Sequence, residues 1–201
     1  MIRLLLADDQ ALVRGALAAL LGLERDLEVV SQVGSGDLVL PAADEYQVDV
    51  ALLDVEMPGL DGIEACRQLT DHLPSTRSLM VTTFGRPGYL RRALDAGARG
   101  FVVKDTPASE LADAVRSVHA GERVIDPALA TESLLDGTNP LTQREQEVLR
   151  VALTGMPAAE IATRVHLSPG TVRNYLSSAI GKTHSTNRVE AAQAAERRGW
   201  L

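Results

Sequence analysis

The chain has 201 residues, of which 45% are hydrophobic and 23% charged, with a formal net charge of −7. This length allows one or two domains that each bury a core of their own, and the ordinary apolar content excludes a wholly disordered chain. The single cysteine, Cys66, excludes an internal disulfide and a site built from several thiolates.

No segment is predicted to enter a membrane. The longest apolar stretch, Leu12–Leu23, is interrupted by Arg14 and is shorter than the roughly 20 residues that span a bilayer. Asp8 and Asp9 come too early for the apolar segment of a signal peptide. We therefore expect a soluble, cytoplasmic protein without membrane insertion.

The first 122 residues are predicted to alternate strands with helices. Strands are expected over Ile2–Ala7, Leu27–Val33, Val48–Asp54, Ser78–Thr83 and Gly100–Lys104, and helices over Gln10–Leu23, Asp37–Glu45, Gly62–Asp71, Gly88–Ala96 and Ala108–Ala120. Apolar strands that alternate with helices imply a parallel sheet covered on both faces. We predict an α/β domain, a doubly wound (βα)5 flavodoxin-like sheet of order 2-1-3-4-5.

Local signals mark the helix ends of this domain. Thr106 is expected to cap a helix that has Pro107 at its first position, and Gly97 and Gly121 fall where helices end in a left-handed conformation. Residues 123–140 are predicted to be a linker, with a helical turn around Leu134 and Leu135.

Residues 141–201 are predicted to form a second, all-α domain of four helices with a helix-turn-helix. The first helix is expected to begin at the capping box Thr142–Glu145, and the second covers Pro157–Val165. Ser168 is expected to cap the third helix, and Asn187 marks the start of the fourth. This domain carries a net charge of +3, whereas residues 1–140 carry −10. A basic domain beside an acidic one is a candidate for binding a polyanion.

Polar side chains follow the strands of the predicted sheet where these strands end. Asp8 and Asp9 follow the first strand and Asp54 ends the third, and these strands are neighbours in the order 2-1-3-4-5. Three converging carboxylates repel one another unless a divalent cation neutralises them, and oxygen ligands suit Mg²⁺. Thr82 and Lys104 add a hydroxyl and an ammonium group at the same edge. This set is suited to phosphoryl transfer to an aspartate.

Each of these residues alone also has a structural explanation, as a helix cap, a loop polar group or a solvated strand end. The sequence runs LLLADD, LLDVEMPGLDG, MVTT and GFVVKD, however, resemble bacterial response-regulator receiver domains over residues 1–122. The resemblance implies that Asp54 is the phosphoacceptor. It also implies that Asp8, Asp9 and Asp54 hold Mg²⁺ together with the backbone carbonyl of Glu56.

The same resemblance assigns three further roles. Lys104 pairs with the phosphoryl group, and Thr82 is the switch hydroxyl that bonds a phosphate oxygen. Phe101 is the aromatic switch that rotates inward behind Thr82, and it stands in place of the commoner tyrosine.

The third helix of the second domain is expected to read DNA in the major groove. Arg173, Asn174 and Ser177 lie opposite its core side, and Arg and Asn suit guanine and adenine respectively. Contacts to phosphates, which position a domain on DNA, are expected from Thr171, Lys182 and Arg188. From charge alone, a four-helix interaction module with a solvated polar face is the favoured explanation, because short helical bundles are common and +3 is a modest charge.

The runs LTQREQEVLRVALTG, AAEIATRVHLSPGTVRNYLSSAIGK and NRVEAA favour the DNA-binding reading, because they resemble the LuxR-type helix-turn-helix of NarL/FixJ response regulators. Two departures, Gly181 and a threonine at Thr183 where leucine is usual, predict fraying of the helix end. TTFGRPGYLRRALDAG, GTVRNYLS and ERRGW resemble the subgroup of desaturase-controlling regulators.

These features predict a two-component response regulator and not an enzyme. A sensor histidine kinase would phosphorylate Asp54, and the resulting homodimer would bind double-stranded promoter DNA. Candidate dimer surfaces are the fourth-helix face or the first and fifth helices, through Val13, Leu20, Leu111 and Val115.

Three alternatives remain at this point. The chain could be a phosphohydrolase that works through an aspartyl phosphate, although a nucleophile on the third strand with its acid pair on the first argues against this. It could bind DNA constitutively, with the first domain only as a dimerisation module. RNA binding is disfavoured because six aromatic residues offer little stacking surface.

Overall fold

The computed structural model describes residues 1–83, 87–127, 129–130 and 139–201. The chain forms two compact units that divide within residues 123–140. The helical turn predicted at Leu134 and Leu135 lies outside the described residues. Within the described part of the chain, no helix combines the length and the apolar character needed to cross a membrane.

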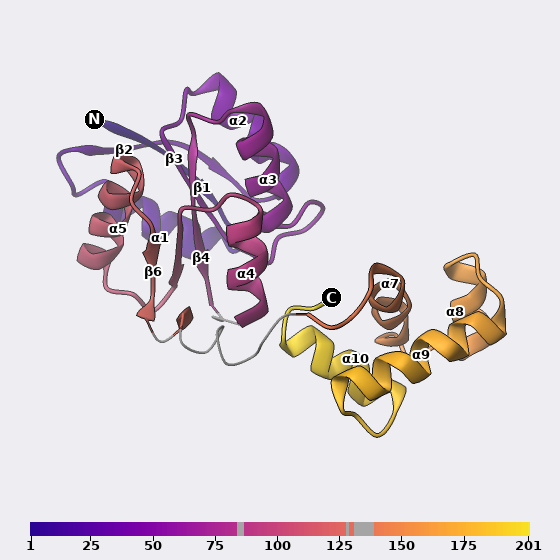
Figure 1. The fold of residues 1–201 in the computed structure, drawn as a ribbon. Coiled ribbons are helices and arrows are strands. Elements are labelled where there is room, and N and C mark those ends of the chain that lie inside the picture. Colours follow the sequence, from indigo (N-terminus) through magenta and orange to yellow (C-terminus); the bar gives the residue numbers. More distant parts are fainter. Residues whose placement is uncertain (84–86, 128, 131–138) are drawn as a thin grey trace. The chain divides into compact units, whose positions relative to one another are not determined.

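The N-terminal unit is built on a parallel sheet of six strands in the order β2-β1-β3-β4-β5-β6 (Figure 1). The strands are β1 (Ile2–Ala7), β2 (Leu27–Val33), β3 (Val50–Leu53), β4 (Arg77–Thr82), β5 (Gly100–Val103) and β6 (Val124–Ile125). The predicted order of the first five strands is confirmed. β6 lies in residues predicted to be linker, and two residues are too short a run to show the alternation by which strands are recognised.

Helices cover both faces of this sheet. They are α1 (Ala11–Leu21), η1 (Gly36–Leu38), α2 (Val39–Glu45), α3 (Gly62–His72), α4 (Pro87–Asp95) and α5 (Ala108–Ala120). Successive strand residues point to opposite faces, so Leu4 and Leu6 pack with α1 and α5, while Leu5 and Ala7 pack with α2, α3 and α4. Both faces are therefore apolar, as the continuous hydrophobic strands predicted.

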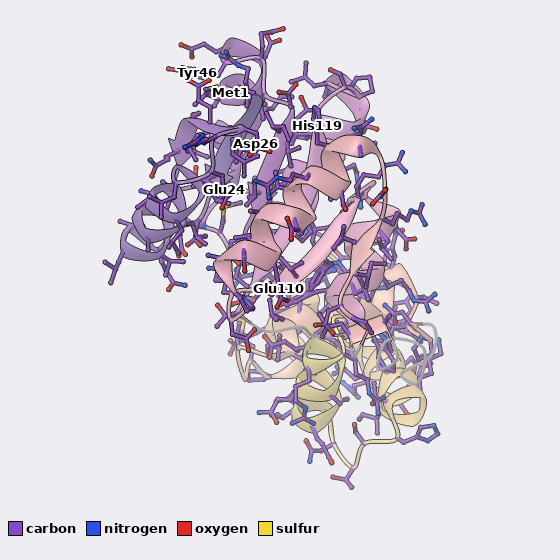
Figure 2. The ribbon with its side chains drawn as sticks, turned by 90° about the vertical axis from the view of Figure 1, so that its left-hand side faces the viewer. Met1, Glu24, Asp26, Tyr46, Glu110 and His119 are labelled. Atoms are coloured by element: carbon purple, nitrogen blue, oxygen red, sulfur yellow. The ribbon has the colours of Figure 1, made fainter. Side chains whose placement is uncertain are left out.

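An ion-pair cluster fastens α5 to the turn that precedes β2. The Arg116 guanidinium donates to Glu24 at 2.6 Å and to Asp26 at 2.8 Å, and both acids lie beside α5 (Figure 2). Hydrogen bonding to Arg116 lowers the pKa of Asp26 to about 2. These bonds hold α5 against the turn before β2.

One predicted helix cap is wrong. Pro107, and not Thr106, is the N-cap of α5, because its ψ of 143° is extended and its carbonyl accepts the N–H of Leu111 at 2.9 Å. Thr106 therefore stands one residue too early to cap with its side chain. Gly97 and Gly121 have φ values of 99° and 94°, which confirms their predicted left-handed conformation.

In the part of the C-terminal unit that the structure describes, four helices form a bundle, as predicted. They are α7 (Gln143–Ala152), α8 (Ala158–Arg164), α9 (Pro169–Thr183) and α10 (Arg188–Arg197). Thr142 and Glu145 form the predicted capping box, and the side chains of Ser168 and Asn187 cap α9 and α10. α9 is a continuous helix to Thr183.

The core of this unit contains Val148 and Leu149 of α7, Ile161 of α8, Val172 of α9 and the indole of Trp200, which is 7% exposed. The side of α9 that packs in this core is thus the predicted one. The other side of the helix does not contribute to the core.

Candidate functional site

The carboxyl ends of β1 and β3 place two buried acids next to each other. Ala7 is paired with Leu53 in the sheet, and the residues that follow them are Asp8 and Asp54. The N–H of Asp54 donates to the carbonyl of Ala7 at 2.8 Å, which fixes the two strand ends together. Asp8 and Asp54 are only 3% and 4% exposed, so the fold holds two carboxylates largely away from water.

Glycine at position 62 makes this packing possible. α3 begins at Gly62, and a Cβ there would lie 1.8 Å from the carbonyl oxygen of Asp54. Since no side chain fits this gap, the start of α3 can approach the backbone of Asp54 closely only with glycine.

Lys104, at the end of β5, completes the predicted cluster. Its Nζ lies 2.7 Å from Oδ2 of Asp8 and 2.7 Å from Oδ2 of Asp54. Asp9 is exposed, and Asp8, Asp9 and Asp54 each offer a carboxylate oxygen within 4.8 Å of the others. The three carboxylates and one ammonium group leave two negative charges at an oxygen-lined site, which fits a divalent cation such as Mg²⁺.

Burial and charge shift the titration of this cluster. Burial is the largest cause that raises the pKa of Asp54, and the charge of Asp8 adds to it, while Lys104 and the backbone of Glu56 act in the opposite direction. Burial alone would lower the pKa of Lys104, but its hydrogen bonds to Asp54 and Asp8 outweigh this and raise it. The ammonium group is therefore held in its charged form between the two acids.

Thr82 and Phe101 lie on the neighbouring strands. Thr82 ends β4 and is 3% exposed, and its carbonyl accepts the N–H of Lys104 at 2.8 Å. Phe101 is completely buried in the core cluster between the sheet and α3 and α4, and its role as the aromatic switch stays a prediction.

Two contacts around the site were not predicted. The Arg14 guanidinium of α1 donates to the carbonyl of Asp8, which ties the loop after β1 to that helix. The hydroxyl of Tyr89 on α4 donates to the carboxylate of Glu56 at 3.2 Å, so α4 contacts the loop two residues after Asp54. Neither contact has a sequence signal, because the partners meet only through the fold.

In the C-terminal unit, α9 presents the predicted base-reading residues to solvent. Arg173, Asn174 and Ser177 are exposed, and Val172 and Leu176 on the other side are buried. The Thr171 hydroxyl shares a hydrogen bond of 2.8 Å with the hydroxyl of Ser168.

The structure gives Lys182 a different partner from the one predicted. Its Nζ lies 2.7 Å from the carboxylate of Glu145 on α7, a residue that the sequence marked only as part of a capping box. The predicted phosphate contact of Lys182 would have to compete with this ion pair. Arg188, at the start of α10, is half-buried.

The part of the predicted dimer surface that lies on α5 is wrong, because its residues are buried. Leu111 and Val115 are 3% and 0% exposed, because the side of α5 that carries them packs on the sheet. α1 instead exposes large apolar side chains: Leu12 is 87% and Leu20 45% exposed, and Leu23, just after the helix, is 78% exposed.

A pocket of acids and a lysine at the strand ends, with a helix-turn-helix in the same chain, defines a response regulator. The model of the family described as "Response regulator receiver domain" matches residues 4–116, and that of "Bacterial regulatory proteins, luxR family" matches residues 139–195. The chain belongs to the response regulators with a LuxR-type domain. It is a two-component regulator of transcription that binds DNA.

Individual relatives agree with this assignment. The chain is 43% identical to the uncharacterized transcriptional regulatory protein YvfU and 42% identical to the transcriptional regulatory protein DesR, both of Bacillus subtilis, over 100% of each chain. The crystal structure of ChrA, a response regulator of a heme-sensing two-component system, matches with a TM-score of 0.61 and 30% identity over 100% of this chain and 98% of that one. The predicted resemblance to NarL/FixJ response regulators is confirmed.

Proposed function

We propose that a sensor histidine kinase phosphorylates Asp54 and that this modification controls homodimerisation and the binding of promoter DNA. The proposal rests on one observation above all. Lys104 Nζ lies 2.7 Å from both Asp8 and Asp54, where it can bind an oxygen of a phosphoryl group on Asp54.

Each residue of the pocket has its own role in the transfer of the phosphoryl group to Asp54. An Oδ atom of Asp54 attacks phosphorus, the bond from phosphorus to the histidine nitrogen of the kinase breaks, and its electron pair returns to that nitrogen. Lys104 stays protonated and balances the added negative charge, and the Thr82 hydroxyl bonds a phosphoryl oxygen. Asp8, Asp9, Asp54 and the Glu56 carbonyl would hold Mg²⁺, which would supply positive charge near the transferred group.

The coupling to dimerisation acts through the elements around the pocket. A phosphoryl group on Asp54 forms bonds to the hydroxyl of Thr82 and the ammonium group of Lys104. These bonds favour one of two arrangements of β4, β5 and α4. Phe101 supports this arrangement from the core. The exposed apolar residues of α1 are a candidate surface for a second copy, because a contact there would remove Leu12 and Leu20 from water.

DNA recognition is assigned to α9, and the domain limits follow from these roles. Arg173, Asn174 and Ser177 read bases, and Thr171 and Arg188 contact phosphates. We assign residues 1–122 together with β6 to the receiver, the remaining residues up to 140 to the linker and residues 141–201 to the DNA-binding domain. The protein acts as a cytoplasmic regulator and not as a phosphohydrolase, since the pocket serves to retain a charge that alters assembly.

The test is the intact mass of the purified protein after incubation with acetyl phosphate and Mg²⁺, beside the Asp54→Asn variant. We expect one added phosphoryl group on the wild type alone, together with a shift from monomer to dimer in light scattering. An adduct on the variant would contradict the assignment of Asp54. Rapid release of inorganic phosphate over many turnovers would favour the phosphohydrolase.

A constitutive DNA-binding protein is the second candidate. It is supported if the Asp54→Ala variant and the phosphorylated wild type bind the same DNA with equal affinity.

A further inference from the structure

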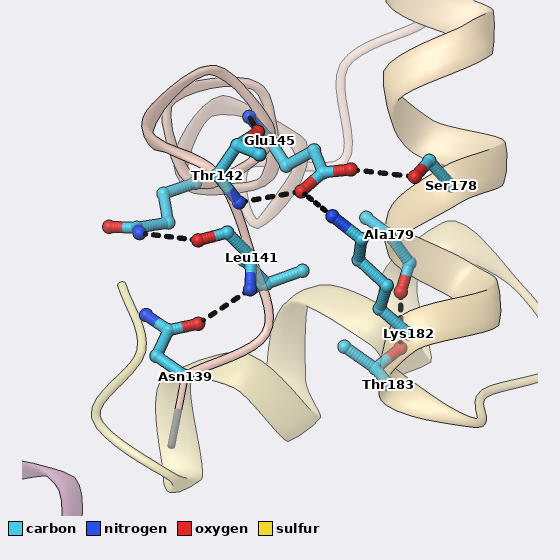
Figure 3. Close-up of polar contacts among 9 residues, drawn as sticks. Asn139, Leu141, Thr142, Glu145, Ser178, Ala179, Lys182 and Thr183 are labelled. Atoms are coloured by element: carbon cyan, nitrogen blue, oxygen red, sulfur yellow. Dashed lines mark hydrogen bonds and ion pairs between the residues drawn. The ribbon is translucent and has the colours of Figure 1, made fainter.

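The C-terminal unit contains a carboxylate that is almost completely buried. Glu145 lies in the first turn of α7 and is 3% exposed. Its two oxygens accept hydrogen bonds from three groups: the N–H of Thr142 at 2.6 Å, the hydroxyl of Ser178 at 2.6 Å and the ammonium group of Lys182 at 2.7 Å (Figure 3). Two of these donors come from α9, so the carboxylate joins the cap of α7 to the recognition helix.

A buried charge is tolerated only when hydrogen bonds and a counter-charge replace water. Burial alone would raise the pKa of Glu145, but the bonds from Lys182, Ser178 and Thr142 outweigh it and lower the pKa to about 2. The carboxylate is therefore ionised at neutral pH, and Lys182 is the cation within bonding distance of it.

This arrangement fixes the orientation of α9. Ser178 and Lys182 are four residues apart and share one side of the helix, and Asn174, four residues before Ser178, lies on the same side. Arg173 and Ser177 form the neighbouring exposed row. Two bonds to one carboxylate on α7 oppose both rotation of α9 about its axis and sliding along it. The bonds thereby set the direction in which the base-reading side chains point.

The last turn of α9, which contains Lys182, is also held by a side-chain hydrogen bond. The buried hydroxyl of Thr183 donates to the carbonyl of Ala179 at 2.8 Å (Figure 3). This bond satisfies a hydroxyl at the position where leucine is usual, and it lies next to Lys182 on the same turn. The end of α9 that carries Lys182 is thus held within the domain.

We infer that Glu145 is a positioning residue for DNA recognition and that Lys182 is its counter-ion and not a phosphate contact. The inference rests on the proposed binding of DNA by α9. It differs from the prediction made from the sequence, in which Lys182 was expected to bind phosphate.

The salt dependence of DNA binding separates these two roles. Each phosphate contact adds about 0.9 to the slope of log affinity against log salt concentration. The full-length protein is titrated onto a fluorescent random-sequence duplex between 50 and 200 mM KCl, and binding is followed by anisotropy. A random duplex suffices, because contacts to phosphates do not depend on sequence.

We expect the Lys182→Met variant to keep the wild-type slope. The Glu145→Gln variant retains an acceptor for the cap but loses the negative charge, so Lys182 is released and the slope becomes steeper by about 0.9. The double variant should return to the wild-type slope. Glu147→Gln is the matched control: it removes the same charge from the same helix, but Glu147 is bound to the exposed Arg144, so the slope should not change.

A second measurement tests positioning. On a duplex that the wild type has selected from a random pool, Glu145→Gln should lose part of its preference over random DNA, while Glu147→Gln should keep it. A slope that is shallower by about 0.9 in Lys182→Met, or an unchanged slope and preference in Glu145→Gln, would overturn the inference. If the wild type binds neither duplex in either phosphorylation state, the proposed function itself fails.

Discussion

Replacing Glu145 by glutamine should destabilise the DNA-binding domain by an amount that depends on pH. A fall in the pKa of Glu145 from its ordinary value of 4.5 to about 2 corresponds to at most ~3 kcal/mol of stability at neutral pH. The side chain of Lys182 is 34% exposed, so solvent screens part of the interaction. We therefore expect a loss of about 1–2 kcal/mol at pH 7.

The direction of the pH dependence follows from the lowered pKa. The folded state holds the proton less tightly than the unfolded state, so the stabilisation is complete above the unfolded pKa of 4.5. It is lost as the pH falls from 4.5 toward 2. The difference between wild type and Glu145→Gln should thus shrink by more than half at pH 3.

The chain contains its own probe for this domain. Trp200 is the one tryptophan of the sequence, and its indole is buried in the C-terminal core. Urea unfolding of the full chain, followed by tryptophan fluorescence at pH 7 and pH 3, therefore reports on the domain that contains Glu145. Glu147→Gln should change the stability by less than about 0.5 kcal/mol at both pH values, because its ion pair is exposed. An equal loss for Glu145→Gln at pH 3 and pH 7 would refute the reasoning, since the charge would then contribute nothing.

Three further changes test other parts of the molecule. Arg173→Ala should weaken binding to the selected duplex by about 1–3 kcal/mol and relax base preference, as measured by anisotropy; unchanged affinity and preference would exclude a base contact. Phe101→Ala should cost about 3–5 kcal/mol in calorimetry of the receiver, because it empties a completely buried site, and a loss below about 1 kcal/mol would contradict that burial. Leu12→Glu combined with Leu20→Glu should abolish the phosphorylation-dependent dimer in light scattering. Leu38→Glu, a change at a leucine that is 53% exposed and lies outside α1, should leave the dimer intact, and a dimer that survives in the double variant would exclude the α1 surface.

The sequence by itself determined the sheet and the position of the acidic pocket. Continuous apolar strands fixed a parallel sheet with two covered faces, and the strand order then placed Asp8 beside Asp54 at one edge. Lys104 could be added because it directly follows β5. Local side-chain signals likewise marked the starts of α7 and α9, since a cap bonds to its own helix within three residues.

The tertiary structure decided every contact between side chains that lie far apart in the chain. Glu145 and Lys182 are separated by 37 positions, and nothing near Lys182 distinguishes a counter-ion from a phosphate contact. Burial on α1 and α5 was also misjudged in part, because the rotation of a helix against its sheet decides which apolar side chains remain exposed, and helical periodicity gives only the spacing. Periodicity and caps act over a few residues, so the sequence reveals them. Pairing across the core depends on how whole elements pack, and only the folded structure supplies that.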